Sequence, residues 1–196
     1  MKNLLAIYTS ASGQHSTSTL LAKEWINEQS ANVVERDLSA SPISHYDEST
    51  LNAFYSDNSV NLTLLQKQAL DVSDELIAEV EDADCLVLAV PMYNYGIPST
   101  LKSWFDHIAR VGKTFSYTDE GPKGILVNKK AVVVLTMGGH HKDTDRDFLT
   151  PYIKQFLAFI GITDVQFIHA EGTAMGDETK SSAINIAKKQ LKDVVN

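Results

Sequence analysis

The sequence predicts an α/β fold with a doubly wound, five-stranded parallel sheet and helices on both of its faces. Short apolar runs recur five times along the 196 residues, and each is followed by a segment with helical spacing of apolar residues. The clearest runs are continuous rather than alternating, which is typical of strands covered on both faces. With 43% hydrophobic and 21% charged residues, the chain has the composition of one globular domain, here expected to span residues 1–196.

The first strand and helix occupy the N-terminal residues. Leu4–Tyr8 is a continuous apolar run and predicts the first strand. A polar stretch, Thr9–Thr19, follows it. Helical spacing then appears at Leu20, Leu21, Trp25 and Ile26. Ser18 stands where a helix cap is expected.

A second strand and a long connection come next. Val33 and Val34 within Asn32–Leu38 predict a weaker strand. We expect an irregular polar connection from Ser39 to Asn61, with a turn at Ser56-Asp57-Asn58. Apolar residues then keep a helical period across Leu62–Asp82.

The third strand is the clearest in the chain. Cys85–Val90 is entirely apolar, and the prolines and glycine of Pro91–Pro98 predict an irregular loop after it. An amphipathic helix is indicated by Leu101, Trp104, Phe105 and Ile108. Thr114–Thr118 alternates and meets the turn Asp119–Pro122, which predicts a hairpin outside the main sheet.

The last two strands complete the sheet. Ala131–Leu135 predicts the fourth strand and leads into the segment Thr136–His141. A helix rich in aromatic residues is expected over Phe148–Ile160, a fifth strand over Asp164–Ala170 and a last helix over Glu178–Val195.

Five parallel strands joined by right-handed crossovers favour the flavodoxin-like order 2-1-3-4-5. In this order the first, third and fourth strands are neighbours, so the loops after them meet at one edge of the sheet. Folds of this kind bind ligands at that edge. The same three loops contain the most unusual segments of the chain, so we expect the functional site there.

The loop after the first strand is rich in hydroxyl groups and directly precedes a helix. It matches neither GxGxxG nor GxxxxGK[ST], so it does not support a dinucleotide or nucleoside-triphosphate site of the usual kind. Hydroxyls and helix-start N–H groups suit a phosphate monoester. The alternative interpretation is a solvated loop with a helix cap.

The other two loops suit a flat aromatic ligand. Met92-Tyr93-Asn94-Tyr95 offers two rings and a carboxamide, which favour stacking and edge hydrogen bonds, although the rings could equally pack the crossover. Thr136-Met137-Gly138-Gly139 ends in paired glycines that allow a ligand to approach the backbone, or that form a tight turn.

These segments resemble the FMN-dependent NADH:quinone oxidoreductases, also called FMN-dependent NADH-azoreductases. The resemblance begins in Pro91–Tyr95 and covers nearly the whole chain. It continues through Leu101-Lys102, Phe105-Asp106, Ala109-Arg110, Thr114-Phe115, Tyr117-Thr118, Gly121-Pro122, Gly138–Asp143, Phe159–Val165 and Ala170–Gly172.

The resemblance implies a homodimer with one FMN per subunit and NADH as the electron donor. By position, Ser10, Ser16, Thr17 and Ser18 would hold the FMN phosphate. Met92-Tyr93-Asn94-Tyr95 would run along the isoalloxazine, and Thr136-Met137-Gly138-Gly139 would cradle its pyrimidine edge. His141 matches a histidine near the flavin, and Tyr117 and Phe159 match positions that line the substrate pocket, partly from the second subunit.

Two positions depart from the family pattern. Met137 stands where the family often has arginine, and Gly96 replaces a frequent asparagine. We expect FMN binding to tolerate both changes, while substrate range and nicotinamide preference depend on them.

The implied chemistry is carried by the flavin, so no catalytic side chain is required beyond it. NADH would reduce the flavin and leave, and a quinone or azo compound would then take its place, which predicts ping-pong kinetics. The rival interpretation is a flavodoxin-like FMN electron carrier without its own substrate turnover. A receiver domain and a hydrolase are disfavoured, because Thr9-Ser10 and Val90-Pro91 replace the acidic residues of the former and no GxSxG is present.

Other chemistry-bearing residues have simpler explanations. Adjacent histidines such as His140 and His141 cannot easily bind one metal, so no metal site is expected. Cys85, the lone cysteine, lies within a predicted buried strand. Asp143, Asp145 and Asp147 lack the glycine and final glutamate of a calcium loop and instead precede a helix.

An aromatic stripe on the Phe148–Ile160 helix indicates a second buried side. Its members are Phe148, Tyr152, Phe156 and Phe159, and an aliphatic face adjoins them. We expect a dimer interface or a ligand pocket to cover this stripe.

The overall charge and hydropathy exclude several partners. The net charge of −8, with no basic stripe, disfavours nucleic acid. No signal peptide and no apolar run of about 20 residues is present, so we expect a cytoplasmic protein without a membrane partner.

Overall fold

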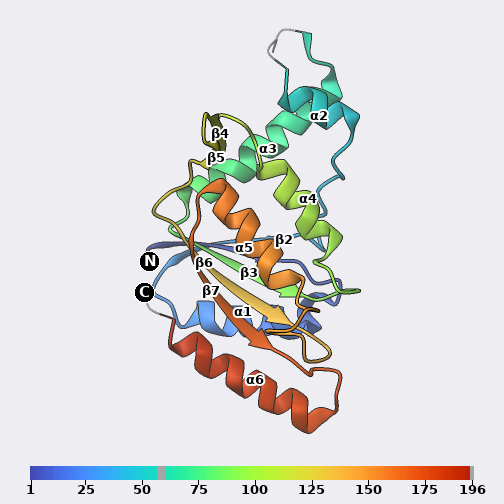
Figure 1. Ribbon diagram of the computed structural model, residues 1–196, viewed down its shortest axis with the longest axis vertical. Coiled ribbons are helices and arrows are strands. Elements are labelled where there is room, and N and C mark those ends of the chain that lie inside the picture. The colour runs from blue at the N-terminus through green and yellow to red at the C-terminus, as the bar shows by residue number, and fades with distance from the viewer. Residues whose placement is uncertain (57–60, 195–196) are drawn as a thin grey trace.

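The computed structural model describes residues 1–56 and 61–194 (Figure 1). Its main sheet has five parallel strands in the order β2-β1-β3-β6-β7. The strands are β1 (Asn3–Tyr8), β2 (Asn32–Asp37), β3 (Cys85–Pro91), β6 (Lys130–Thr136) and β7 (Asp164–Ala170). Since β4 and β5 form a separate hairpin, this is the order 2-1-3-4-5 counted along the sheet strands, and the predicted fold class is confirmed.

Helices cover both faces of the sheet (Figure 1). Helices α1 (Thr17–Asn27) and α6 (Asp177–Lys192) pack on one face, while α3 (Leu64–Asp82), α4 (Ser99–Ile108) and α5 (Leu149–Ile160) lie on the other. The apolar run of β1 is continuous because both faces of this strand are buried. Leu5 and Ile7 belong to the core under α3, α4 and α5, whereas Leu4 and Tyr8 belong to the core over α1 and α6.

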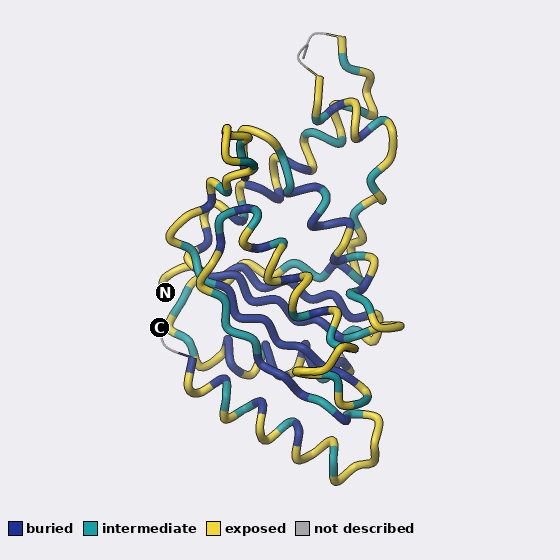
Figure 2. The backbone as a smooth tube through the Cα atoms, in the orientation of Figure 1, coloured by how far each residue is buried: buried dark blue, intermediate teal, exposed yellow. Residues whose placement is uncertain are grey.

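Strands β1, β3 and β6 form the buried centre of the molecule (Figure 2). All seven residues of β3 are buried, including Cys85, whose thiol pKa is raised to about 12 by burial. This cysteine is therefore part of the core and stays protonated at neutral pH.

The connection after β2 contains a helix that the sequence did not predict. Helix α2 (Glu48–Phe54) begins after Asp47, whose carboxylate accepts the Thr50 N–H at 2.8 Å. Only Thr50 and Ala53 are buried on it, so it carries too little apolar periodicity to be recognised. Asp57 and Asn58 of the predicted turn lie outside the described residues.

Two predicted helix ends are also corrected. The N-cap of α1 is Ser16, not Ser18, because the Ser16 hydroxyl accepts the Thr19 N–H at 3.4 Å. Ser18 lies inside the first turn. The last helix ends at Lys192, and its predicted end at Val195 lies outside the described residues.

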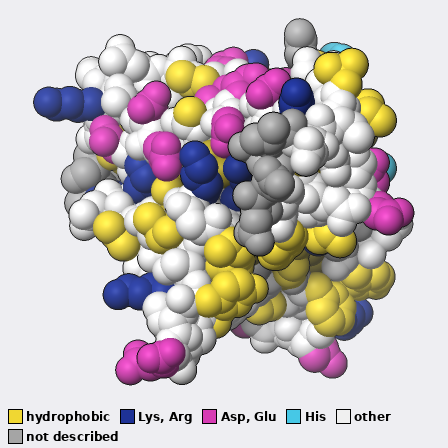
Figure 3. All heavy atoms as spheres, turned by 90° about the horizontal axis from the view of Figure 1, so that it is seen from above, with side chains coloured by type: hydrophobic (Ala, Val, Ile, Leu, Met, Phe, Trp, Pro, Cys, Tyr) yellow, Lys and Arg dark blue, Asp and Glu magenta, His cyan; other side chains and the backbone are white. Residues whose placement is uncertain are grey.

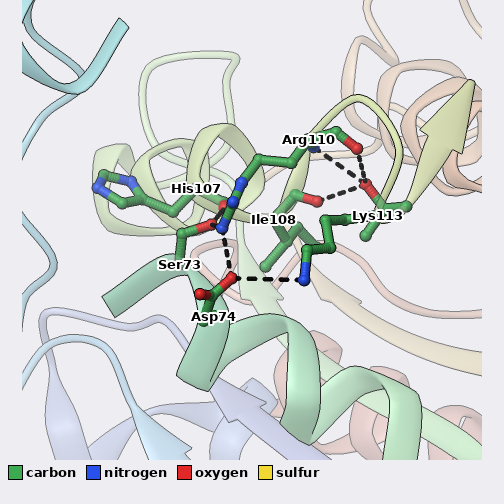
Figure 4. Close-up of polar contacts among 7 residues, drawn as sticks. Ser73, Asp74, His107, Ile108, Arg110 and Lys113 are labelled. Atoms are coloured by element: carbon green, nitrogen blue, oxygen red, sulfur yellow. Dashed lines mark hydrogen bonds and ion pairs between the residues drawn. The ribbon is translucent and has the colours of Figure 1, made fainter. Parts of the chain in front are cut away.

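The predicted hairpin is present as β4 (Phe115–Thr118) and β5 (Gly121–Gly124), which pair antiparallel. A polar cluster anchors the chain just before it (Figure 4). The Arg110 guanidinium donates to Asp74 Oδ1 at 2.6 Å, and the Arg110 N–H donates to Thr114 Oγ1 at 3.1 Å. Thr114 in turn donates to the Ile108 carbonyl at 2.6 Å. These contacts join α3 to the end of α4 and fix where the hairpin starts.

Candidate functional site

The loops after β1, β3 and β6 contact one another at the carboxyl edge of the sheet, as expected for neighbouring parallel strands. The Ser10 and Tyr93 hydroxyls share a hydrogen bond of 2.9 Å, which joins the first loop to the second. The Met92 N–H donates to the Thr136 carbonyl at 2.8 Å, and the rings of Tyr95 and His141 meet edge-on at 5.5 Å between centroids. The thirteen residues predicted to bind the cofactor lie on these three loops, at the start of α1 or, for Thr136, at the end of β6. They are Ser10, Ser16, Thr17, Ser18, Met92, Tyr93, Asn94, Tyr95, Thr136, Met137, Gly138, Gly139 and His141.

The first loop offers buried hydroxyls and free helix-start amides. Ser10, Ser16 and Ser18 are buried, and the Ser16 and Ser18 hydroxyls lie 3.0 Å apart. Within the described residues, the N–H groups of Thr17 and Ser18 have no hydrogen-bond partner. The positive end of the α1 dipole adds to these donors, so the loop suits an anion such as a phosphate.

The second loop turns back on itself in a two-residue turn. Tyr93 and Gly96 exchange both backbone hydrogen bonds at 2.9 Å. Asn94 and Tyr95, at the centre of the turn, have φ of 51° and 62°. These values define a type I′ turn, which asparagine tolerates and tyrosine does not favour. Backbone strain at a bulky residue is typical of a functional site.

The third loop presents a row of free backbone donors. The carbonyls of Met137, Gly138 and Gly139 accept N–H groups of the segment after β7, at 3.0–3.1 Å. The N–H groups of Gly138, Gly139 and His140, in contrast, have no partner in the part of the chain that the structure describes. A loop with its acceptors occupied and three consecutive donors free suits a ligand with carbonyl or ring-nitrogen acceptors.

The glycines of this loop leave little room for a side chain. A Cβ at Gly139 would lie 3.2 Å from His141 Nε2, and one at Gly138 would lie 3.3 Å from the Ala174 Cβ. His141 itself has a buried Nδ1 without a partner among the described residues. A buried polar atom without a partner is costly unless a ligand or a rearrangement supplies one.

Glu171 is a charged residue beside the third loop that was not predicted to be part of the site. Glu171 Oε1 accepts the N–H groups of both His141 and Lys142, at 2.6 and 2.7 Å. His169 lies nearby at the end of β7, and burial lowers the pKa of its imidazole. Glu171 follows a strand that neighbours β6, so the reasoning from sheet order could have found it.

No group of three or more metal-ligating side chains is arranged to hold a metal ion within residues 1–56 and 61–194. Likewise, none of the helices described here combines the length and apolar character that a membrane crossing requires.

A cavity of about 760 Å³ adjoins the second loop. It lies against Gly96 and Ile97 of that loop and against Phe148 and Tyr152 of the α5 region. Burial raises the pKa of the Tyr152 phenol, which therefore stays protonated and able to donate. The volume and the aromatic walls are in the range of small-molecule sites.

Tyr117 and Phe159 lie away from the three loops within one chain. Phe159 packs on Phe115 at 4.3 Å between ring centroids, and Phe115 contacts Tyr117 at 5.6 Å. Phe115 and Tyr117 lie on the hairpin and Phe159 lies near the end of α5. The second loop instead adjoins the start of α5. Their predicted place in a substrate pocket would need a second subunit, and it stays a prediction.

The chain is similar to proteins of a known family. The family model described as flavodoxin-like fold matches residues 2–195. The FMN-dependent NADH:quinone oxidoreductase of Alcanivorax borkumensis is 45% identical over 195 residues, covering 96% of this chain and 98% of the relative. FMN-dependent NADH:quinone oxidoreductase 1 of Photobacterium profundum is 42% identical over 197 residues, covering 99% of each.

Solved structures share the fold. The FMN-dependent NADH-azoreductase of Bacillus anthracis, in complex with FMN, superposes with a TM-score of 0.87 at 24% identity, covering 100% of both chains. From the matching family model and the full-length curated relatives, we conclude that the chain belongs to the flavodoxin-like fold family and, within it, to the FMN-dependent NADH:quinone oxidoreductases.

Proposed function

We propose that this protein is an FMN-dependent oxidoreductase that passes electrons from NADH to quinones. One observation carries the proposal most strongly: two loops that meet at the same sheet edge both present free backbone donors, at Thr17 and Ser18 and at Gly138–His140. The first set suits a phosphate and the second a pyrimidine edge, and a flavin mononucleotide contains both groups. Full-length relatives named for this cofactor and reaction support the same proposal.

The residues fit FMN in three parts. Ser10, Ser16, Thr17 and Ser18 would hold the phosphate through hydroxyl and amide donors. Met92, Tyr93, Asn94 and Tyr95 would flank the ring system, with Tyr93 tied to the phosphate loop through Ser10. Thr136, Met137, Gly138, Gly139 and His141 would bind the pyrimidine edge, which the free amides and the unpartnered His141 Nδ1 favour.

When bound, FMN would supply the redox chemistry, which is hydride transfer between NADH and the acceptor. The chain's own part is to bind and orient. The strained turn at Asn94 and Tyr95 and the clamped third loop hold fixed groups around the ring, so little reorganisation is needed during the reaction.

We further propose that donor and acceptor use one pocket in turn. The cavity beside Gly96 and Tyr152 has the size of a small-molecule site, and donor and acceptor that enter it in turn would give ping-pong kinetics. A quinone would need one reduction cycle, and an azo bond would need two, because its full cleavage takes four electrons.

A homodimer is part of this proposal. Phe148, which precedes α5, and Tyr152 on that helix are 54% and 38% exposed in one chain, beside the cavity that they line. A second subunit placed on this side would cover both rings and could bring its own Tyr117 and Phe159 to the pocket.

An absorbance spectrum of the purified protein tests the function directly. We expect flavin bands near ~370 and ~450 nm that bleach with NADH under anaerobic conditions and return with a benzoquinone, because the bound cofactor carries the electrons. Flavin bands that NADH fails to bleach would favour an electron carrier instead. Absence of flavin bands, even after incubation with FMN, would contradict the proposed function.

A further inference from the structure

We propose that Glu171 is the positioning residue for the flavin-binding donors of the third loop, an inference that rests on the proposed function. A single carboxylate oxygen, Glu171 Oε1, accepts the N–H groups of His141 and Lys142 at 2.6 and 2.7 Å. Both distances are short, as expected for hydrogen bonds to a charged acceptor. Glu171 lies 30 residues from His141 in the sequence, so the contact is purely tertiary.

The glutamate completes a clamp that the neighbouring backbone begins. Beyond the end of β6, the carbonyls of Met137, Gly138 and Gly139 accept N–H groups from Thr173, Ala174 and Gly172. The backbone N–H groups of residues 172–174 therefore hold the carbonyls of residues 137–139 in place. The amides of His141 and Lys142 are instead bound by the Glu171 side chain.

Glu171 binds some of the amides of this loop and leaves others available to a ligand. Five consecutive residues, 138–142, carry amides, of which the last two are bound by Glu171 and the first three have no partner within the described residues. Without the carboxylate, the 140–142 segment could turn and its amides would compete for the same ligand acceptors or for water. The carboxylate thus leaves a row of three donors in a fixed arrangement.

Close packing strengthens the case for a fixed loop. Gly172, next to Glu171, has φ of 70°, and a Cβ there would lie 2.8 Å from the Thr179 methyl group and 3.2 Å from the His140 ring. The backbone of 171–172 is therefore pressed between α6 and the loop. This packing places the backbone beside Glu171 in close contact with the loop.

The charge of Glu171 acts on the site besides its hydrogen bonds. It lines a cavity of about 510 Å³ together with His140, Lys142, His169 and Glu178. The Lys142 side chain pairs with Asp143 at 3.8 Å rather than with Glu171. A negative charge beside the loop opposes the extra negative charge that a flavin acquires on reduction, so it should lower the reduction potential of bound FMN.

Three variants separate these roles. Glu171→Ala removes both hydrogen bonds, Glu171→Gln keeps an oxygen acceptor but removes the charge, and Glu178→Gln removes a charge from the same cavity with no hydrogen bond to the loop among the described residues. We expect Glu171→Ala to weaken FMN binding by about tenfold or more, as measured by quenching of flavin fluorescence. Glu171→Gln should restore binding to within about threefold of the wild type, and Glu178→Gln should match the wild type.

Two further readouts do not depend on activity. Amide hydrogen exchange of a peptide covering 137–143 in the flavin-free protein should be faster in Glu171→Ala than in Glu178→Gln. The reduction potential of bound FMN should rise in Glu171→Gln even though binding is restored. Thermal melting of each variant checks that it folds.

The outcomes are distinguishable. Unchanged FMN affinity and unchanged exchange of the 137–143 peptide in a folded Glu171→Ala protein would overturn the inference, while the proposed function would stand. Failure of the wild-type protein to bind FMN would overturn the proposed function, and the exchange experiment would still decide whether Glu171 holds the loop.

Discussion

Tyr95 shows how one residue couples strain to binding. Its φ of 62° is unfavourable for a bulky side chain, yet its ring meets His141 edge-on and joins the second loop to the third. Tyr95→Gly should relieve the backbone strain and raise the free energy of unfolding by about 1 kcal/mol. The same change should weaken FMN binding, because the ring that joins the two loops is lost. Urea denaturation and flavin titration measure the two effects, and Tyr95→Phe, which keeps the ring, serves as the control. A stabilised variant with wild-type FMN affinity would show that the ring does not contribute to the site.

Protonation of His169 should make the folded protein less stable as the pH falls. Burial lowers its pKa below the ordinary value of about 6.5, so the folded protein holds it neutral while the unfolded chain takes up a proton as the pH falls. The free energy of unfolding is therefore highest above about pH 6.5, as far as His169 is concerned, and it decreases as the pH falls below this value. His169→Gln, which keeps a neutral partner for Thr150, should flatten the fall in stability between pH 7 and pH 5. Chemical denaturation at several pH values measures this slope, and equal slopes in both proteins would count against His169 as its source.

At the scale of elements, the hairpin is held to α5 by the close approach of two backbones. A Cβ at Gly124 of β5 would lie 2.1 Å from the backbone nitrogen of Gly161, which ends α5, so only glycine fits there. The Leu126 N–H also donates to the Ile160 carbonyl at 3.0 Å. Gly124→Ala should therefore force the hairpin away from α5 and lower the free energy of unfolding by about 2 kcal/mol. The exposed neighbour Lys123→Ala is the matched control and should stay within about 0.5 kcal/mol of the wild type. Equal melting temperatures for the two variants would mean that the hairpin shifts to accommodate the Cβ without loss of stability, which would contradict the prediction.

At the scale of the whole molecule, exposed apolar side chains indicate where a partner would bind. Viewed from the end that carries α2, hydrophobic side chains gather on the surface (Figure 3). Large apolar residues exposed on α2 and at the start of α3 include Leu51, Tyr55, Leu64 and Leu65. Patches of this kind commonly mark interaction sites. Together with the exposed rings on α5, they are consistent with the proposed homodimer.

A charge introduced at the start of α5 tests that assembly. Phe148→Glu should shift the protein from dimer to monomer in sedimentation at micromolar concentration, because a carboxylate would be buried without a partner in the interface. The helix itself should tolerate the change, since acidic residues are favourable near a helix N-terminus. Gln155→Glu, at an exposed position on the same helix, adds the same charge and should leave the dimer intact. A wild-type protein that sediments as a monomer would contradict the dimer.

The sheet, its strand order and the meeting of three loops at one edge could be predicted from the sequence. Continuous apolar runs such as Leu4–Tyr8 and Cys85–Val90 indicate burial on two faces, which is typical of a parallel sheet between helix layers. Once the order was known, the three loops had to meet, because the carboxyl ends of neighbouring parallel strands lie at one edge. The short helix α2 was missed for a related reason, since it buries too few residues to leave a periodic pattern.

Which polar groups find partners depends on the folded arrangement of the chain. Ser16, Thr17 and Ser18 are alike in sequence, and which hydroxyl caps α1 depends on the angle at which the chain enters the helix. The free amides of Gly138–His140 and the carboxylate of Glu171 could not be recognised locally, because their state is set by segments about 30 residues away. Periodicity records how deeply a segment is buried, whereas a hydrogen bond depends on the distance and angle between two groups. That geometry exists only once the strands have brought the groups together.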